Sequence, residues 1–149
     1  NAIAGHPYLT SYYTENIIVT PHMKEMSRLT GIQIEEMKEN PVRTAREFAD
    51  QYGVVCVLKD AATVIAGRDG KTFVNGSGTP AMAKGGSGDV LTGVIAGLVA
   101  LGLEESDAAA LGVYVHGLAG EAAEKHFGVH GVLAGEIADC LPEVYRDGI

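Results

Sequence analysis

The chain contains no Trp, and aromatic residues make up only 6% of its 149 residues. Cationic residues are also few, with 11 Lys and Arg against 19 Asp and Glu, so the formal net charge is −8. Non-specific binding to nucleic acid and docking on an anionic membrane both rely on clustered cations, and we expect neither partner. A phosphate-bearing ligand is compatible with this charge, because backbone N–H groups bind anions locally.

Cysteine is equally scarce, with two residues. Cys56 lies within an apolar run, which indicates a buried, reduced thiol rather than a disulfide. The sequence also lacks a signal peptide and any apolar run of ~20 residues; its longest apolar stretch, residues 90–103, is short and rich in Gly. We therefore expect a cytoplasmic protein.

Short apolar runs alternate with helical patterns along the chain. Residues 16–20 and 54–59 are rich in β-branched residues and predict buried strands. Residues 63–66 and 72–75 predict a hairpin around Asp69-Gly70. This alternation predicts an α/β fold with a mainly parallel sheet, in which residues 1–149 form a single, partial domain. Helices are expected over residues 24–30, 41–52 (begun by Asn40-Pro41 and ended by Gly53), 89–101, 104–127 and 136–145.

The most informative stretch is a glycine-rich turn over residues 82–93. Gly85, Gly86 and Gly88 surround Ser87, so the backbone can turn sharply and expose successive N–H groups. A helix that begins near Ser87 adds its own free N–H groups and the positive end of its dipole, which together predict an anion hole. Asp89 is expected to stay ionised there and to accept a proton from an attacking hydroxyl beside a bound phosphate. The plain alternative is a glycine turn capped by Ser87 or Asp89.

Two other patterns resemble nucleotide-binding motifs. Gly70-Lys71-Thr72 looks like the end of a P-loop, but Ile65 stands where that motif needs Gly, so the hairpin is favoured. No G-x-G-x-x-G stretch follows a strand, so a Rossmann site has no support.

The histidines after residue 100 carry no predicted chemistry. His116 stands beside Gly117 and near Gly120, a cluster that indicates close helix packing. His126 and His130 flank a turn and have no acidic or Cys partners at metal-ligand spacing along the chain, so neither receives a role.

Residues 83–93 (AKGGSGDVLTG) resemble the signature of the carbohydrate-kinase-like family, in the ribokinase-like superfamily, that includes the ADP-dependent (S)-NAD(P)H-hydrate dehydratases. Four further stretches resemble family motifs in the same order: residues 20–26 (TPHMKEM), 58–63 (LKDAAT), 74–82 (VNGSGTPAM) and 116–120 (HGLAG). The resemblance implies a three-layer α/β/α ribokinase-like fold. It also implies a repair enzyme, a lyase that dehydrates the damaged cofactors NADHX and NADPHX back to NADH and NADPH.

The resemblance implies a kinase-like reaction in which a nucleotide phosphorylates the added hydroxyl and phosphate then leaves. The co-substrate would be ADP, with ATP as the alternative, and Mg²⁺ would bridge its phosphates. By motif match, Asp89 would be the catalytic base and would contact the hydrated dinucleotide together with His22. The implied phosphate-binding set is Gly85, Gly86, Ser87 and Gly88, and the implied nucleotide-binding set is Lys59, Asp60, Ala61, Ala62, Thr63 and Gly88.

The chain also departs from the family. Asp60 stands where the family has Gly, and its carboxylate would repel a phosphate unless it points away or meets the metal. Family domains are longer, and Asn1 matches a residue midway along them, so we expect the N-terminal half of the fold to be missing here. The chain alone should then be inactive, with an exposed sheet edge and apolar surface that favour a homo-oligomer.

Two alternatives remain beside the dehydratase. One is a small-molecule kinase of the same fold, acting on a vitamin precursor such as hydroxyethylthiazole. The other is a nucleotide-binding fragment without catalysis. The stretches at residues 20–26 and 116–120 favour the dehydratase over the kinase, and the intact Gly88-Asp89 pair speaks against loss of catalysis.

Overall fold

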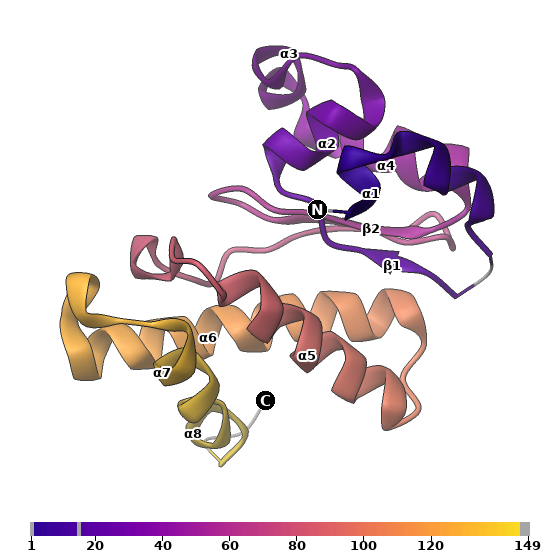
Figure 1. The fold of residues 1–149 in the computed structure, drawn as a ribbon. Coiled ribbons are helices and arrows are strands. Elements are labelled where there is room, and N and C mark those ends of the chain that lie inside the picture. The colour runs from indigo at the N-terminus through magenta and orange to yellow at the C-terminus, as the bar shows by residue number, and fades with distance from the viewer. Residues whose placement is uncertain (1, 15, 147–149) are drawn as a thin grey trace. The chain divides into compact units, whose positions relative to one another are not determined.

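The computed structural model describes residues 2–14 and 16–146, which fall into two compact units (Figure 1). Unit 1 is Asn1–Asn75 and unit 2 is Gly76–Ile149. Asn1, which we expected to match a residue midway along the longer family domains, lies outside the described residues. Among the described residues, no helix has both the length and the apolar character needed to cross a membrane. That the units form one domain remains a prediction.

Unit 1 is built on a sheet with strand order β1-β2-β3-β4. β1 and β2 are parallel, whereas β2 with β3 and β3 with β4 are antiparallel. The expectation of a mainly parallel sheet is therefore wrong for these strands. Parallel neighbours need a crossover of about a dozen residues or more, and the connections on both sides of β3 are too short for one. The strands are β1 (Ile18–Val19), β2 (Val55–Leu58), β3 (Val64–Ala66) and β4 (Thr72–Val74).

The predicted hairpin joins β3 to β4. Gly70 has φ 83°, a left-handed conformation that favours glycine. The N–H of Gly67 donates to the carbonyl of Lys71 at 2.9 Å, and the Asp69 carboxylate accepts from the Lys71 N–H at 3.1 Å. The stretch that looks like a P-loop is thus a turn between strands.

Three helices of unit 1 pack with the sheet in one hydrophobic cluster. Buried Met26, Met37 and Phe48 come from the helices, while Cys56 and Leu58 come from β2. The helices are α2 (Met23–Thr30), α3 (Ile34–Glu39) and α4 (Pro41–Tyr52), and two shorter elements, α1 (Ala2–Gly5) and η1 (Pro7–Tyr12), precede β1.

Cys56 is fully buried and reduced, as expected from its apolar run. Burial raises the pKa of its thiol to about 12, so little reactive thiolate forms near neutral pH. We expect a Cys140→Ala variant, in which Cys56 is the remaining thiol, to react with a thiol reagent only as fast as unit 1 unfolds. Labelling followed by mass spectrometry, with and without denaturant, measures this; rapid labelling of the native chain would contradict it.

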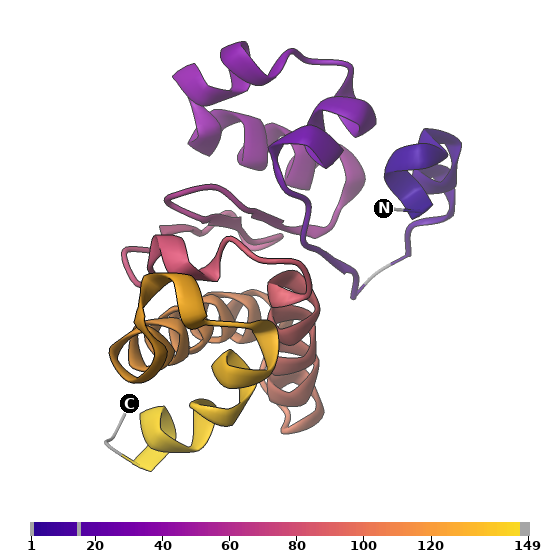
Figure 2. The same ribbon diagram turned by 60° about the vertical axis from the view of Figure 1, so that its left-hand side comes forward.

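Unit 2 is helical, and its two long helices lie side by side (Figures 1 and 2). They approach closely, because a Cβ on Gly112 of α6 would lie 2.7 Å from the Ile95 side chain of α5. Gly128 has non-helical angles, φ 71° and ψ 161°, and interrupts α6 near its end. The elements are η2 (Pro80–Met82), α5 (Ser87–Ala100), α6 (Glu105–Gly131), α7 (Ala134–Asp139) and α8 (Leu141–Arg146).

The single last helix expected over residues 136–145 is two helices in the structure. α7 ends at Asp139 and α8 begins at Leu141, with Cys140 between them. Pro142 explains the break: it has no N–H to donate to the carbonyl of residue 138, and its ring would clash in a continuous helix. Ile137, Cys140 and Val144 join the buried cluster that α6 contributes to.

Candidate functional site

The glycine turn before α5 presents free backbone amides. Gly86 caps the helix with φ 90°, and its carbonyl accepts from the N–H groups of Asp89 at 3.0 Å and Val90 at 3.1 Å. Within residues 2–14 and 16–146, the N–H groups of Gly85, Gly86 and Gly88 have no hydrogen-bond acceptor. Gly85 and Gly86 are exposed and Gly88 is half-buried. Unpaired amides at a helix N-terminus are the arrangement that binds an anion.

Ser87 differs from its glycine neighbours. Its side chain is buried, and Oγ lies 3.5 Å from Nε2 of buried His116 on α6. Its N–H donates over a long 3.4 Å to the carbonyl of Lys84. The side chain of Ser87 therefore packs toward α6, and its part in phosphate binding stays a prediction.

Asp89 is the third residue of α5 and is exposed. It is neither buried in packing nor distant along the backbone from the free amides, because it directly follows Gly88. A carboxylate so placed can accept a proton from a group bound at those amides.

In unit 1, the ends of the parallel strands bring His22 and Lys59 together. These residues form an isolated parallel bridge beyond the strands, with Lys59 directly after β2 and His22 three residues after β1, and the N–H of Lys59 donates to the carbonyl of Pro21 at 2.8 Å. The carboxyl ends of parallel strands are where α/β sheets bind ligands. The sequence predicted both residues at the carboxyl ends of strands, and the structure places them there.

The rest of the predicted nucleotide-binding stretch forms the short connection from β2 to β3. Asp60, Ala61 and Ala62 are exposed, and Thr63 is half-buried with its carbonyl accepting from the N–H of Asn75 at 2.9 Å. Among the described residues Asp60 has no hydrogen bond or ion pair. Its carboxylate is therefore not turned into the fold.

His22 also caps helix α2. Its Nδ1 accepts from the Glu25 N–H at 3.0 Å, while Glu25 Oε2 accepts from the His22 N–H at 2.9 Å. Because Nδ1 is an acceptor, the proton of a neutral His22 ring lies on Nε2. The side chain is 49% exposed, so this Nε2–H can donate to a ligand. Sequence reasoning placed Glu25 in the first turn but missed the reciprocal cap, which Ser or Thr makes more often than His.

The environment of Glu25 fits this capping role. Burial raises the pKa of its carboxyl, but the hydrogen bond from the His22 backbone and the charge of His22 are among the effects that lower it, and the net direction is downward. The carboxylate form that the cap needs is therefore favoured.

The candidate residues thus form two sets. His22 and residues 59–63 belong to unit 1, and residues 85–89 belong to unit 2. A third group, His126, Cys140 and Glu143 in unit 2, was not expected from the sequence. Cys140 and Glu143 are close together in the chain, but His126 lies on α6, and the fold brings it next to them.

Comparison with known proteins identifies relatives over nearly the whole chain. A protein-family model described as NAD(P)H-hydrate dehydratase matches residues 1–143. The bifunctional NAD(P)H-hydrate repair enzyme Nnr of Moorella thermoacetica is 45% identical over 131 residues, a match that covers 88% of this chain and 25% of that protein. The ADP-dependent (S)-NAD(P)H-hydrate dehydratase of Bacillus subtilis is 39% identical over 130 residues, covering 87% of this chain and 47% of that protein.

A solved structure extends the likeness to three dimensions. The ADP/ATP-dependent NAD(P)H-hydrate dehydratase of Bacillus subtilis, co-crystallised with ATP/Mg²⁺, matches with a TM-score of 0.86 and 38% identity over 91% of this chain and 50% of that one. This confirms the expected ribokinase-like α/β fold. The chain spans about half the length of that protein and about a quarter of the bifunctional enzyme.

Proposed function

Because the chain belongs to the NAD(P)H-hydrate dehydratase family, we propose that it carries catalytic machinery for the ADP-dependent conversion of (S)-NADHX and (S)-NADPHX to NADH and NADPH. The observation that carries this proposal is the set of unpaired amides at Gly85, Gly86 and Gly88, with exposed Asp89 directly after them. The amides can bind the phosphoryl group during its transfer. The carboxylate of Asp89 can accept the proton that the substrate hydroxyl loses.

The first step is phosphoryl transfer from ADP to the added hydroxyl of the substrate. Asp89 accepts the hydroxyl proton as the new P–O bond forms and the bond to the AMP leaving group breaks. The three glycine amides donate to the phosphoryl oxygens, where negative charge is spread in the transition state. Phosphate then departs from the hydrated ring with its C–O bonding electrons, and loss of the neighbouring proton restores the double bond.

Mg²⁺ fits the residues present. When bound, the ion neutralises charge on the nucleotide phosphates. It is usually held by one or two carboxylates together with phosphate oxygens and water, and Asp60, in the predicted nucleotide-binding stretch, is an exposed carboxylate. Asp60 is free for such a role, since among the described residues it has no other partner.

The residues of unit 1 would bind the two ligands. We assign the adenosine side of the nucleotide to Lys59, Asp60, Ala61, Ala62 and Thr63, in the connection that follows β2. We assign the hydrated dinucleotide to His22, whose half-exposed ring can donate to it through the Nε2–H. His22 and Lys59 already stand next to each other through their β-bridge.

Two substitutions at His22 separate substrate binding from helix capping. His22→Asn keeps a side-chain acceptor for the Glu25 N–H but removes the Nε2–H, so we expect the KM for the hydrated dinucleotide to rise at unchanged stability. His22→Ala should raise that KM and also cost about 1 kcal/mol of stability through loss of the cap. Steady-state kinetics and urea unfolding of both variants check this; an unchanged KM in both would remove His22 from the substrate site.

The share of its relatives that the chain covers bears on activity and assembly. The chain covers 47% of the Bacillus subtilis relative, so we propose that turnover needs the other half as well. β1 and β4 are the edges of the described sheet, and Phe73 and Val74 on β4 are exposed, which supports a homo-oligomer. We place the protein in the cytoplasm, where its cofactor substrates are used. Light scattering on the complete protein measures the oligomeric state.

The activity test mixes the complete protein with hydrated NADH, ADP and Mg²⁺ and follows the return of NADH absorbance. Parallel reactions with ATP and with hydrated NADPH define the co-substrate and the preferred substrate. Return of absorbance with stoichiometric release of AMP and phosphate supports the proposal. A vitamin-precursor kinase would leave the absorbance unchanged and would consume ATP only after hydroxyethylthiazole is added as phosphoryl acceptor. A non-catalytic nucleotide-binding protein would consume no nucleotide in either mixture.

A further inference from the structure

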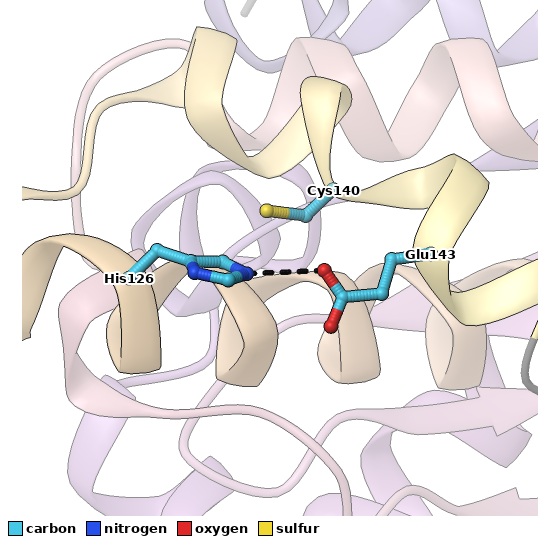
Figure 3. A group of neighbouring side chains, drawn as sticks. All are labelled: His126, Cys140 and Glu143. Atoms are coloured by element: carbon cyan, nitrogen blue, oxygen red, sulfur yellow. Dashed lines mark hydrogen bonds and ion pairs between the residues drawn. The ribbon is translucent and has the colours of Figure 1, made fainter.

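Three potential metal ligands meet where the end of α6 lies against the junction of α7 and α8 (Figure 3). His126 Nε2 lies 3.1 Å from Glu143 Oε2. One ring nitrogen of His126, one carboxylate oxygen of Glu143 and Cys140 Sγ all lie within 4.8 Å of one another. With Zn–S of about 2.3 Å and Zn–N and Zn–O of about 2.0 Å, tetrahedral geometry places S about 3.5 Å from N or O, and N about 3.3 Å from O. The His126–Glu143 pair already has this spacing, and the sulfur needs to approach by at most about 1.3 Å.

The backbone holds two of the three ligands in place. The Cys140 carbonyl accepts from the N–H groups of Glu143 at 3.2 Å and Val144 at 3.4 Å, in the first turn of α8. Cys140 and Val144 are also buried in the cluster that includes Ala122 and Ala123 of α6. This packing fixes the junction against α6, while the side chains of His126 and Glu143, 54% and 38% exposed, can adjust around an ion.

The surroundings of Cys140 favour a cation. The carboxylates of Glu143, Asp139 and Glu136 lie close enough to its thiol to act on it electrostatically. The same three carboxylates attract a divalent ion, which would displace the thiol proton on binding. The alternative to a metal site is an ion pair between His126 and Glu143 alone. Such a pair would give no role to the Cys140 thiol, which lies within 4.8 Å of both groups.

We propose that His126, Cys140 and Glu143 bind a transition-metal ion, with Zn²⁺ as the fitting species, and that water takes its fourth position. A thiolate, an imidazole and a carboxylate are a borderline-soft ligand set that suits Zn²⁺ and Co²⁺, whereas Mg²⁺ prefers oxygen ligands. The ion would tie the end of α6, just before its break at Gly128, to the two C-terminal helices. Tying these helices together would stabilise unit 2, and the site is distinct from the glycine turn at residues 85–88.

Titration of the purified chain with Co²⁺ tests the proposal, because cobalt bound to thiolate gives a charge-transfer absorption that cobalt bound only by nitrogen and oxygen does not. We expect about one Co²⁺ per chain with this absorption, displacement by Zn²⁺, and a rise in Tm with either ion. Loss of an outer-shell partner alone lowers metal affinity about 10–100-fold, so His126→Gln should lower it by at least about tenfold. Cys140→Ser should abolish the thiolate absorption.

His130→Gln is the matched control, because His130 is also exposed, lies four residues further along α6 and is not part of the cluster. It should bind Co²⁺ as the unchanged chain does. The proposal is overturned if the unchanged chain binds neither Co²⁺ nor Zn²⁺. It is also overturned if the His126→Gln and Cys140→Ser variants bind these ions as tightly as the unchanged chain does. Since His126 is exposed and Cys140→Ser is nearly isosteric, circular dichroism should show both variants folded.

Discussion

Asp89→Asn is expected to lower kcat for the dehydration by about 10²–10⁴-fold, the usual contribution of a general base. The substitution keeps the shape of the side chain and leaves the backbone amides of the glycine turn unchanged. Nucleotide binding should therefore persist while turnover is lost. Steady-state kinetics, together with calorimetric titration of ADP, separate these two effects.

Asp107→Asn provides the matched control. Asp107 is the third residue of α6, as Asp89 is of α5, and both side chains are exposed. Each substitution removes one charge from the first turn of a helix, where a carboxylate typically stabilises by about 0.3–1 kcal/mol. The stability losses should therefore be similar, and only Asp89→Asn should abolish turnover. Equal kcat values for the two variants would remove Asp89 from the reaction.

Residues with strong local signals were predicted well from sequence. Asn40-Pro41 and Gly53 bound α4 in the structure as predicted, with Asn40 Oδ1 accepting from the Arg43 N–H at 2.9 Å and Gly53 at φ 64°. The glycine turn, too, could be predicted from sequence, because the first N–H groups of a helix have no partner within it and a glycine before the helix has no side chain to cap them. Such features depend on a few neighbouring residues, and those are all visible in the sequence.

Features that depend on distant residues were not predictable in the same way. α3 begins at Ile34 after Gln33, which makes no side-chain cap, so no start signal marks it. The grouping of His126 with Cys140 and Glu143 depends on the return of α7 and α8 beside α6, and no spacing along the chain encodes that return. His126 thus has no potential metal-ligand partner at the usual spacing along the chain, but it has two in the folded structure.

The packing at Gly117 was predicted only in part. The sequence indicated close helix packing around His116, and the structure identifies Ser77 as the residue that packs against Gly117. A Cβ on Gly117 would lie 2.0 Å from Ser77 Oγ and 2.8 Å from the Ser77 carbonyl carbon. Ser77 cannot easily withdraw, because its Oγ donates to the Tyr114 carbonyl at 3.0 Å and the Gly78 N–H donates to Glu121 Oε1 at 2.8 Å. The loop that leads to the glycine turn is therefore held directly on α6.

Gly117→Ala should consequently destabilise unit 2. Overpacking costs about 1–3 kcal/mol, and a clash with fixed backbone belongs at the upper end, which outweighs the gain of about 1 kcal/mol from replacing Gly by Ala in a helix. Gly120→Ala should cost less, because its Cβ would meet the flexible end of Met82. Gly97 is an exposed position of α5 where an added Cβ has no atom within 4 Å, so Gly97→Ala should stabilise by about 1 kcal/mol.

Urea unfolding of the three variants measures these differences in stability. We expect Gly117→Ala to be the least stable, Gly120→Ala intermediate and Gly97→Ala the most stable. If Gly117→Ala were as stable as Gly97→Ala, the loop would not be fixed on α6 at this point. If instead Gly117→Ala is destabilised and also binds ADP more weakly, whereas Gly97→Ala binds it normally, the packing of Ser77 on α6 helps to position the amides of Gly85, Gly86 and Gly88. The small residues of the His116 stretch would then serve nucleotide binding through the loop they hold, without touching the nucleotide themselves.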